Sequence, residues 1–335
     1  MRLRGGLGRA ALGVTISIVA LALVARTVDL PAAWATLRAA DLRWVVLLVA
    51  FACGDILLRA VRWRVLLAPL ALVPLRATLA SLLVGYLANN VLPARLGELV
   101  RSHDLSLRTE VPTSTVLGTI VVERVVDTLV VVAIAAAAIL VLSVRGVVAS
   151  AVLVGLAVTA LLVLAVAAGI YAHRLPGADR ARAFLDRWPR VRDVLRRLRD
   201  GLAVASDMRT MAVAIALSVG SWSFTVLAFA AAAQAVGIEP TMGQAALLAA
   251  GVNLATAVPA GPGYVGTFEL AAVTIAASVG IPAEAALAFA ILVHATSLLL
   301  TSAGGAVALV LRPRRRVEAL PALAADAPPP RSPER

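Results

Sequence analysis

The sequence VVASAVLVGLAVTALLVLAVAAGIY, from Val147 to Tyr171, carries no charged side chain. A helix needs about 20 consecutive apolar residues to span the hydrocarbon core of a bilayer. This stretch exceeds that length without interruption, so it predicts a transmembrane helix. A chain with such a helix must place its other segments relative to a membrane.

Similar apolar segments lie on both sides of this helix. Those long enough to cross a bilayer, or extendable to that length, cover residues 10–25, 44–58, 113–142, 210–233 and 283–311. The first resembles a signal peptide, but Arg26 follows it at once and no small-residue cleavage site stands out, so we expect a retained anchor. Together with 147–171, these segments predict about six full crossings.

The composition agrees with a membrane protein. Hydrophobic residues make up 61% of the chain and charged residues 15%, against roughly 45–50% and about 25% in soluble domains. A net charge of +12 would suggest nucleic acid on a soluble protein. Here the basic residues cluster between apolar segments, which favours a role in topology and contact with anionic lipid headgroups, and no nucleic-acid partner.

The sequence lacks the residues and motifs that several enzyme classes require. All 31 basic residues are arginine, so the chain contains neither the lysine of a nucleotide-binding P-loop nor a Schiff-base lysine. Cys53 is the single cysteine, and no zinc-protease motif, cysteine-rich metal spacing or nucleophile elbow is present. We therefore expect no catalytic residues, no metal and no cofactor. An intramembrane enzyme that acts on lipid headgroups is the less supported alternative.

The arginines also predict the topology, because positive charge accumulates in cytoplasmic loops. With the N-terminus in the cytoplasm, the arginine-rich segments 59–76, 174–209 and 312–335 are all cytoplasmic if the two interrupted apolar segments do not cross the membrane. These segments, 72–92 and 244–258, must then each enter and leave the membrane on the same face. This predicts two re-entrant hairpins and cytoplasmic N- and C-termini.

Interrupted helices of opposite orientation are a mark of inverted-repeat transporters, and broken backbone at membrane depth must be surrounded by protein or water. The two interruptions share an order of residues: Asn90, Pro93, Gly97, Glu98 and Asn253, Pro259, Gly263, Glu269. The predicted fold class is an all-α polytopic membrane protein. It has about six full transmembrane helices plus two re-entrant broken hairpins in an inverted repeat, within residues 1–311.

Two motifs near the first interruption carry charge. Arg95, Glu98 and Arg101 recur every three residues, which places them on one helical face. They form either a solvated loop helix or a site where the planar arginine forks bind lipid phosphate. Glu123, Arg124 and Asp127 lie within about one helical turn. They form either an interfacial cluster or a polar wall that pairs with Arg95 or Arg101, and lone charges at this depth are costly.

The second interruption carries glycines and a carboxylate. Gly261, Gly263 and Gly266 spell G-x-G-x-x-G, but no strand precedes them and Pro262 lies inside, so a dinucleotide site is disfavoured. The alternative is a hinge whose backbone N–H groups receive an anion, such as a lipid headgroup. Glu269 either carries a proton or caps the following helix. His294 is either a hydrogen-bonded core histidine or a proton relay.

Residues 174–209 form a basic amphipathic segment. Its apolar residues recur at four–three spacing: Phe184, Trp188, Val191, Leu195, Leu198 and Leu202. Pro189 is expected to separate two helices. The segment either lies on an anionic membrane surface or docks onto the transmembrane body. Residues 312–335 are rich in proline and arginine and predict a disordered tail.

Four motifs occur in a fixed order along the chain: Arg62-Trp63, Asn90-x-x-Pro93-x-Arg95-x-Gly97-Glu98-x-x-Arg101, Glu123-Arg124-x-x-Asp127 and Pro259-x-Gly261-x-Gly263-x-x-Gly266-x-x-Glu269. Together they resemble the flippase-like domain family, also called the lysylphosphatidylglycerol synthase transmembrane region. The chain departs from the family at Ala260-Gly261-Pro262, where two adjacent glycines are common, and this leaves the local turn geometry open.

The resemblance implies a membrane domain that moves lipids between leaflets. Full-length aminoacyl-lipid synthases add a soluble catalytic domain, which we expect this chain to lack. The leading expectation is a flippase- or scramblase-like transporter of an anionic or phosphate-bearing lipid, either a phospholipid or an isoprenoid-linked lipid, in the bacterial plasma membrane. The alternative is a membrane accessory protein of a separate enzyme that makes a glycolipid, hopanoid or aminoacyl-lipid.

Overall fold

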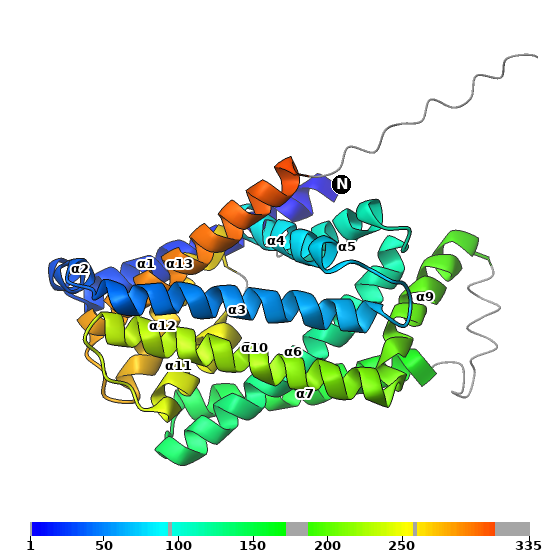
Figure 1. Cartoon of the computed structure of the whole chain (residues 1–335). Coiled ribbons are helices and arrows are strands. Elements are labelled where there is room, and N and C mark those ends of the chain that lie inside the picture. The colour runs from blue at the N-terminus through cyan, green and yellow to red at the C-terminus, as the bar shows by residue number, and fades with distance from the viewer. Residues whose placement is uncertain (1, 93–95, 172–186, 257–259, 312–335) are drawn as a thin grey trace, which may run out of the picture.

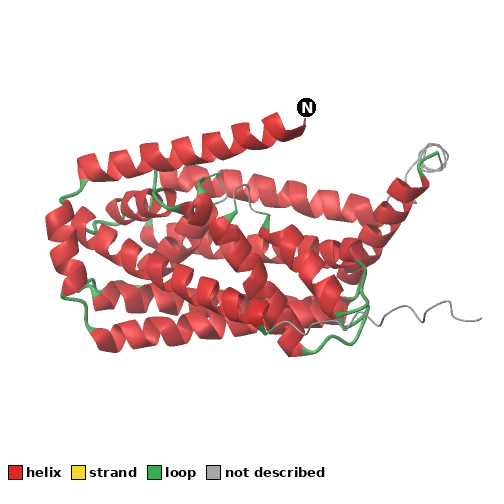
Figure 2. Cartoon of the chain, turned by 90° about the horizontal axis from the view of Figure 1, so that it is seen from above, coloured by secondary structure: helices red, strands yellow, loops and turns green. Residues whose placement is uncertain are grey.

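The computed structural model describes residues 2–92, 96–171, 187–256 and 260–311, and all regular elements within these ranges are helical (Figures 1 and 2). Five of the described helices are long and apolar enough to cross a membrane: α3 (Leu42–Leu67), α6 (Thr113–Leu142), α7 (Val147–Tyr171), α10 (Met208–Ala235) and α13 (Ala283–Val310). A sixth span is formed if α1 (Arg2–Thr27) and α2 (Leu30–Arg38), bent by 89°, count together. The predicted all-α polytopic class is confirmed.

Helix α3 is longer than the sequence suggested. The apolar segment 44–58 was expected to be short but extendable, and the helix extends from Leu42 to Leu67. Arg59, Arg62 and Arg64 are therefore helical residues. Arg62 is buried, and Arg59 is largely so. Their charges are neutralised by carboxylates inside the protein, which allows the helix to continue.

The first interrupted segment is an antiparallel helical hairpin, α4 (Leu75–Val91) and α5 (Gly97–Arg108). The Ser81 hydroxyl donates to Asp104 at 2.7 Å near the open end, and the Gly97 N–H donates to the Asn89 side chain at 2.8 Å near the tip. Residues 93–95 of the tip, including Pro93 and Arg95, lie outside the described residues.

The second interrupted segment is built in the same way from α11 (Met242–Ala255), the short η4 (Pro262–Tyr264) and α12 (Thr267–Ala277). Thr241 caps α11 in a reciprocal arrangement with Gln244, whose side-chain amide also donates to the Val279 carbonyl at 3.2 Å. This bond joins the start of α11 to the chain just beyond α12, so these arms are also antiparallel.

The two hairpins begin at opposite ends of a central helix pair. Helices α3 and α10 run side by side (Figure 1). The Asp41 N–H donates to the Ala235 carbonyl at one end, and Arg62 bonds to Ser218 towards the other, so the two helices are antiparallel. One hairpin follows the end of α3 and the other follows the end of α10. Their tips nevertheless meet, because η4 contacts α4.

The helices repeat an order of long helix, hairpin and long helix: α3, α4, α5, α6 and then α10, α11, α12, α13. Contacts between the halves follow the same symmetry, since α13 packs on α4 and α6 packs on α11. Exchanging the halves maps one contact onto the other, which supports the predicted inverted repeat. That each hairpin is re-entrant depends on the position of the bilayer and stays a prediction.

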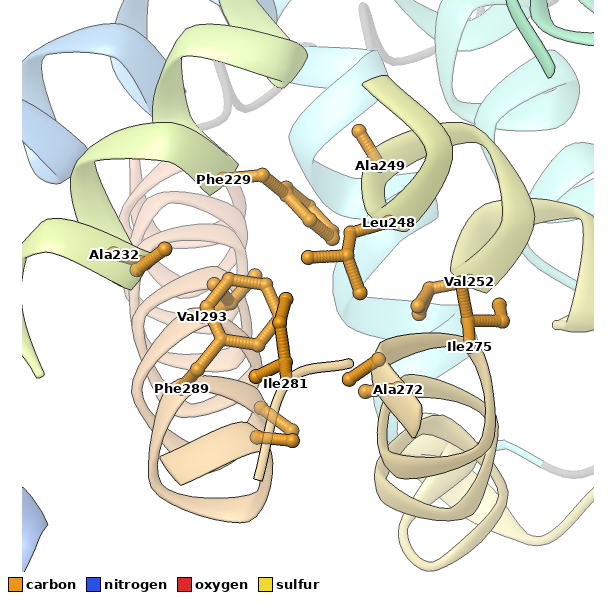
Figure 3. Packing of buried hydrophobic residues seen from close by; sticks show 14 of the residues in the cluster. Phe229, Ala232, Leu248, Ala249, Val252, Ala272, Ile275, Ile281, Phe289 and Val293 are labelled. Atoms are coloured by element: carbon orange, nitrogen blue, oxygen red, sulfur yellow. The ribbon is translucent and has the colours of Figure 1, made fainter. Parts of the chain in front are cut away.

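Small residues allow the helices of the second half to approach closely. A core cluster joins Phe229 and Ala232 of α10, Leu248 of α11, Ala272 of α12 and Phe289 of α13 (Figure 3). Phe229 and Phe289 meet edge to face with ring centroids 5.5 Å apart. In a membrane, where lipid tails are as apolar as the side chains, such packing is a main source of helix association.

Helix α9 (Pro189–Leu202) begins at the proline predicted to separate two helices. Its C-terminal end docks on α6, where Gly201 and Gly118 bring the two backbones together. Towards its N-terminus, Trp188, Val191 and Leu195 are exposed. Docking onto the transmembrane body is thus observed for one end only, and contact of the other end with anionic lipid stays a prediction. Phe184 lies outside the described residues.

Replacing Gly201 with valine should release α9 from α6. A Cβ at Gly201 would lie 2.1 Å from the Thr115 carbonyl oxygen, and relieving such overpacking costs about 1–3 kcal/mol. We expect tryptic cleavage at the arginines of α9 to become about tenfold faster, the factor that corresponds to about 1.4 kcal/mol. Gly155→Ala, whose Cβ would meet Val132 at an ordinary 3.4 Å, is the control and should keep the wild-type cleavage rate.

Candidate functional site

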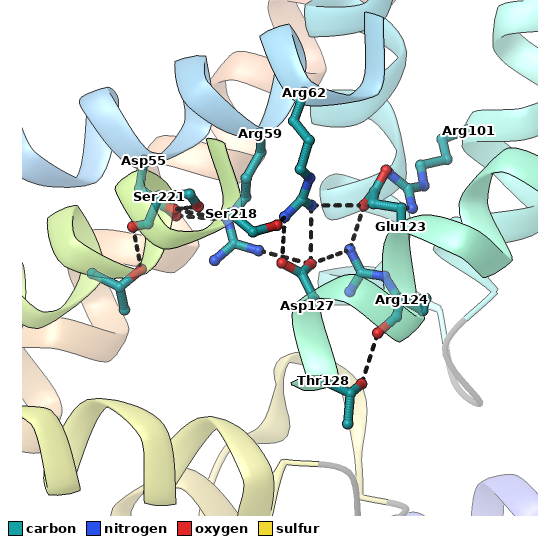
Figure 4. Close-up of polar contacts among 11 residues, drawn as sticks. Asp55, Arg59, Arg62, Arg101, Glu123, Arg124, Asp127, Thr128, Ser218 and Ser221 are labelled. Carbon is teal, nitrogen blue, oxygen red and sulfur yellow. Dashed lines mark hydrogen bonds and ion pairs between the residues drawn. The ribbon is translucent and has the colours of Figure 1, made fainter. Parts of the chain in front are cut away.

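Charged residues of the first half form one ion-pair cluster beside α10 (Figure 4). Asp127 is its centre: the carboxylate accepts from both terminal nitrogens of Arg62, from Nη2 at 3.0 Å, and lies 3.4 Å from Nη1 of Arg59. Arg62 is 0% exposed, and its Nη1 also donates to the Ser218 hydroxyl at 2.6 Å. The ion-pair cluster comprises Asp55, Arg59, Arg62, Arg101, Glu123, Arg124 and Asp127.

Glu123 forms the second centre of the cluster. Arg101 donates to both of its oxygens, at 3.2 and 3.1 Å, while Arg62 lies at 3.3 Å and Arg124 at 2.5 Å. Glu123 and Asp127 are both buried inside the protein. Whether they also lie at the membrane interface depends on the position of the bilayer and stays a prediction. The alternative that paired the motif with Arg101 agrees with the structure for Glu123.

Helix α5 is not a solvated loop helix, because Arg101, Ser102 and Asp104 are buried in it. The Arg101 guanidinium also lies over the Trp63 ring, 4.9 Å from its centroid. Glu98, in the first turn of α5, lines a cavity described below. Arg95 lies outside the described residues, so its role as a phosphate ligand stays a prediction.

Asp55 was not singled out in the sequence. It bonds Nε of Arg59 at 2.8 Å and accepts a hydrogen bond from the Ser221 hydroxyl of α10. Asp55, Arg59 and Arg62 recur at positions i, i+4 and i+7, so they share one face of an otherwise apolar helix. That charged stripe is the signal that could have identified them.

The charges of the ion-pair cluster do not cancel. Four arginines face three carboxylates, which leaves one positive charge among these residues. Arg124 is the most accessible, with its side chain 41% exposed against 11% or less for the other three arginines. The excess charge can therefore be presented to a ligand by Arg124.

A cavity of about 1280 Å³ lies between the two halves. Its polar lining includes Asp55, Arg59, Arg101, Arg124 and Asp127 of the cluster, and the two hairpins contribute Asn89, Asn90, Glu98, Gly263 and Tyr264. Its apolar lining includes exposed residues of α1 and α7, among them Val19, Leu23, Val154 and Val158. The cavity thus joins a charged interior to apolar helix faces.

Two hydrogen-bond donors in the cavity lining lack a protein partner among the described residues. These are Nε of Arg124 and the indole Nε1 of Trp222, both buried. An unpaired buried donor is costly, so a side-chain movement that opens either atom to the cavity would favour a ligand or water with acceptor oxygens. This pattern is suited to a ligand that is rich in acceptors and carries negative charge.

The glycine turn, residues Gly261–Gly266, uses its backbone donors internally. The Gly261 N–H donates to the Ser17 hydroxyl at 3.0 Å, and the Gly266 N–H donates to Glu269 at 2.6 Å. Gly263 and Gly266 have φ of 66° and 88°, values that glycine adopts without steric cost. An anion could use the first and last N–H groups of the turn only by displacing these bonds.

Known protein families were compared with this chain. A sequence model described as "Lysylphosphatidylglycerol synthase TM region" matches residues 10–305. The chain belongs to this family. Comparison with curated proteins and with solved structures finds no match.

In this member of the lysylphosphatidylglycerol synthase TM family, Glu269 does cap its helix, through the bond to the Gly266 N–H at the start of α12. Its other oxygen lies 2.6 Å from Nδ1 of His294 on α13. His294 is buried and hydrogen-bonded, as one alternative held. Within the described residues, no group of three or more histidine, cysteine or acidic side chains could hold a metal ion.

Proposed function

We propose that the protein is a flippase- or scramblase-like lipid transporter that moves an anionic or phosphate-bearing lipid between leaflets. The observation that carries this proposal is the cavity between the two halves, whose lining contains three arginines of the cluster, with Arg124 the most accessible of them. Family membership is consistent with a lipid-related membrane role. The inverted arrangement of the hairpins resembles that of transporters with a central site.

The headgroup would enter the cavity at Arg124. The Arg124 side chain is 41% exposed, and Arg59 and Arg101 line the same cavity. Arginine suits this role because its planar fork matches phosphate geometry. We assign Arg101 chiefly to positioning, since Glu123 already accepts from both of its terminal nitrogens.

The acyl chains would remain against the exposed apolar residues of α1 and α7 that line the cavity. Moving them through a polar interior would remove apolar surface from lipid, whereas leaving them outside does not. The substrate would be a phospholipid or an isoprenoid-linked lipid of the bacterial plasma membrane. The arginine distribution further supports cytoplasmic N- and C-termini.

The test is reconstitution in liposomes that contain leaflet-resolved fluorescent lipids, with anionic, zwitterionic and isoprenoid-linked substrates in separate preparations. Arg124→Gln should lower the transport rate about tenfold, because a hydrogen bond to a charged group contributes about 1.5–3 kcal/mol. Arg124→Lys should restore part of the rate, since lysine retains the charge without the fork. Folded yield is measured on the same preparations.

Arg145→Gln is the matched control, because Arg145 is exposed beyond the end of α6 and does not line the cavity. It should transport at the wild-type rate. Wild-type protein that moves none of the three substrates would overturn the proposal. Co-purification with a lipid-modifying enzyme would then favour the accessory role.

A further inference from the structure

His294 places both of its ring nitrogens against acceptors. Nδ1 lies 2.6 Å from Oε1 of Glu269, and Nε2 lies 2.7 Å from the carbonyl oxygen of Gly263. The imidazole is buried and stacked on Phe268, with centroids 4.4 Å apart. Glu269 uses its remaining oxygen to accept from the Gly266 N–H. His294 on α13 thus binds the glycine turn directly at Gly263 and indirectly, through Glu269 of α12, at Gly266.

This geometry requires one proton beyond a neutral histidine and an ionised glutamate. A neutral imidazole donates from one nitrogen only. A carbonyl oxygen accepts and never donates, so Nε2 must carry a hydrogen. The short Nδ1–Oε1 contact then needs a second hydrogen, held on either atom. Without it, two lone pairs would face each other at 2.6 Å.

We propose that Glu269 and His294 form a binding site for one proton, and that the bound proton fastens the glycine turn to α13. When the proton leaves, the single remaining imidazole hydrogen can serve only one acceptor. The bond to the ionised Glu269 is charge-assisted and is the stronger of the two. The Gly263 carbonyl therefore loses its donor, and the turn is released from α13.

The first half has an equivalent contact between its hairpin and the following long helix, but that contact cannot be broken by loss of a proton. Arg124 lies eleven residues after the start of α6 at Thr113, and His294 lies eleven residues after the start of α13 at Ala283. Near these two positions, each helix binds the second helix of the hairpin that precedes it. In the first half, Glu123 of α6 binds Arg101 of α5; in the second half, His294 of α13 binds Glu269 of α12. Arginine does not lose its proton in proteins. Release on proton loss is thus confined to the α11–α12 hairpin.

The other charged groups near His294 belong mainly to the opposite half of the cavity. Helices α1, α7, α10 and α11 contribute no titratable residue to the described lining. His294 lines the cavity. The other titratable groups of its described lining are Asp55, Arg59, Tyr86, Glu98, Arg101, Arg124, Asp127 and Tyr264. Five of these belong to the ion-pair cluster. Among the described residues, the carboxylate paired with His294 is that of Glu269.

The test measures the position of the turn directly, so it is independent of lipid transport. Cys53 is exposed on α3, and Val265 is exposed in the turn. Spin labels on Cys53 and on Val265→Cys report their separation by pulsed electron resonance on full-length protein. The distances are measured at about pH 5 and at about pH 9. We expect one narrow distance distribution at the lower pH and an additional, displaced population at the higher pH.

Two variants separate proton binding from other effects of pH. Glu269→Gln imitates the protonated carboxylate, because the amide nitrogen donates to Nδ1 while the oxygen still accepts from the Gly266 N–H. It should give the narrow distribution at both pH values. His294→Phe keeps the stacking on Phe268 but forms neither bond, so it should give the displaced population at both.

The control label is Leu96→Cys, also paired with Cys53, at the start of the arginine-bound helix α5. Its distance to Cys53 should not change with pH. An unchanged wild-type distribution at Val265 would overturn the proposal, and so would a pH response that persists in Glu269→Gln. If His294→Phe does not fold, the comparison of wild type with Glu269→Gln still tests whether the pH response depends on the Glu269 carboxylate.

Discussion

Asp127→Asn should be among the most destabilising single substitutions in the ion-pair cluster. Three arginines share this carboxylate: Arg62, Arg59 and Arg124. Removing its charge leaves buried guanidinium groups without compensation, and breaking a buried ion pair in this way costs about 3–5 kcal/mol. We expect a large loss of folded protein, measured as thermal stability in detergent by size-exclusion chromatography.

A second substitution tests the cause. Arg62→Met removes the fully buried guanidinium while keeping an unbranched side chain of similar length, so the double variant Arg62→Met/Asp127→Asn should be more stable than Asp127→Asn alone. The cycle yields the coupling between the two residues. Asp193→Asn is the control: its partner Arg192 is 3.6 Å away and both side chains are exposed, so its loss should be within about 1 kcal/mol. Equal stability of Asp127→Asn and Asp193→Asn would contradict the role given to the cluster.

Thr128→Trp should abolish most lipid transport without unfolding the protein. Thr128 lines the cavity and lies about one helical turn beyond Arg124, to whose carbonyl its hydroxyl donates at 2.7 Å. An indole at this position would cover the guanidinium and occupy the headgroup space. Loss of the charged contact and overpacking together cost about 3 kcal/mol, so the transport rate in liposomes should fall about a hundredfold.

Leu129→Trp is the matched control for this variant. Leu129 is the next residue of α6, is exposed and does not line the cavity. It adds the same side chain on a different face of the same helix, so transport should remain near wild type. If both tryptophans slowed transport equally, the cavity would not be the route.

Helix α7 shows where sequence reasoning was sufficient. Residues 147–171 carry no charge, and the structure has one helix with those bounds. Helix α3 shows where it failed. Local hydropathy treats arginine as the end of a span, but Arg62 is neutralised by Asp127, 65 positions later in the chain. A local pattern cannot include such a partner, so the sequence predicted a span that could be extended but not how far it extends past residue 58.

The site shows the same division. Pairing of Glu123 with Arg101 could be anticipated, because both lie on short helical motifs and buried carboxylates need cations. The connection of His294 to the glycine turn could not, because the sequence offers only a lone histidine in an apolar helix. Its two partners come from different elements, η4 and α12, and only the folded hairpin brings them to one ring.

The ion-pair cluster has a consequence for biogenesis. All seven of its charged residues lie on α3, α5 and α6. Helix α10 contributes the hydroxyl groups of Ser218 and Ser221 and the ring of Trp222, all more than 150 positions after Arg62. During synthesis, chains acquire structure from the N-terminus onward. When α6 has left the ribosome, all charged residues of the ion-pair cluster have been synthesised. The buried ion pairs can therefore form in the membrane before the remaining helices are made. Insertion can therefore proceed as two successive events, in which the second half packs onto a first half whose buried carboxylates are already paired with arginines.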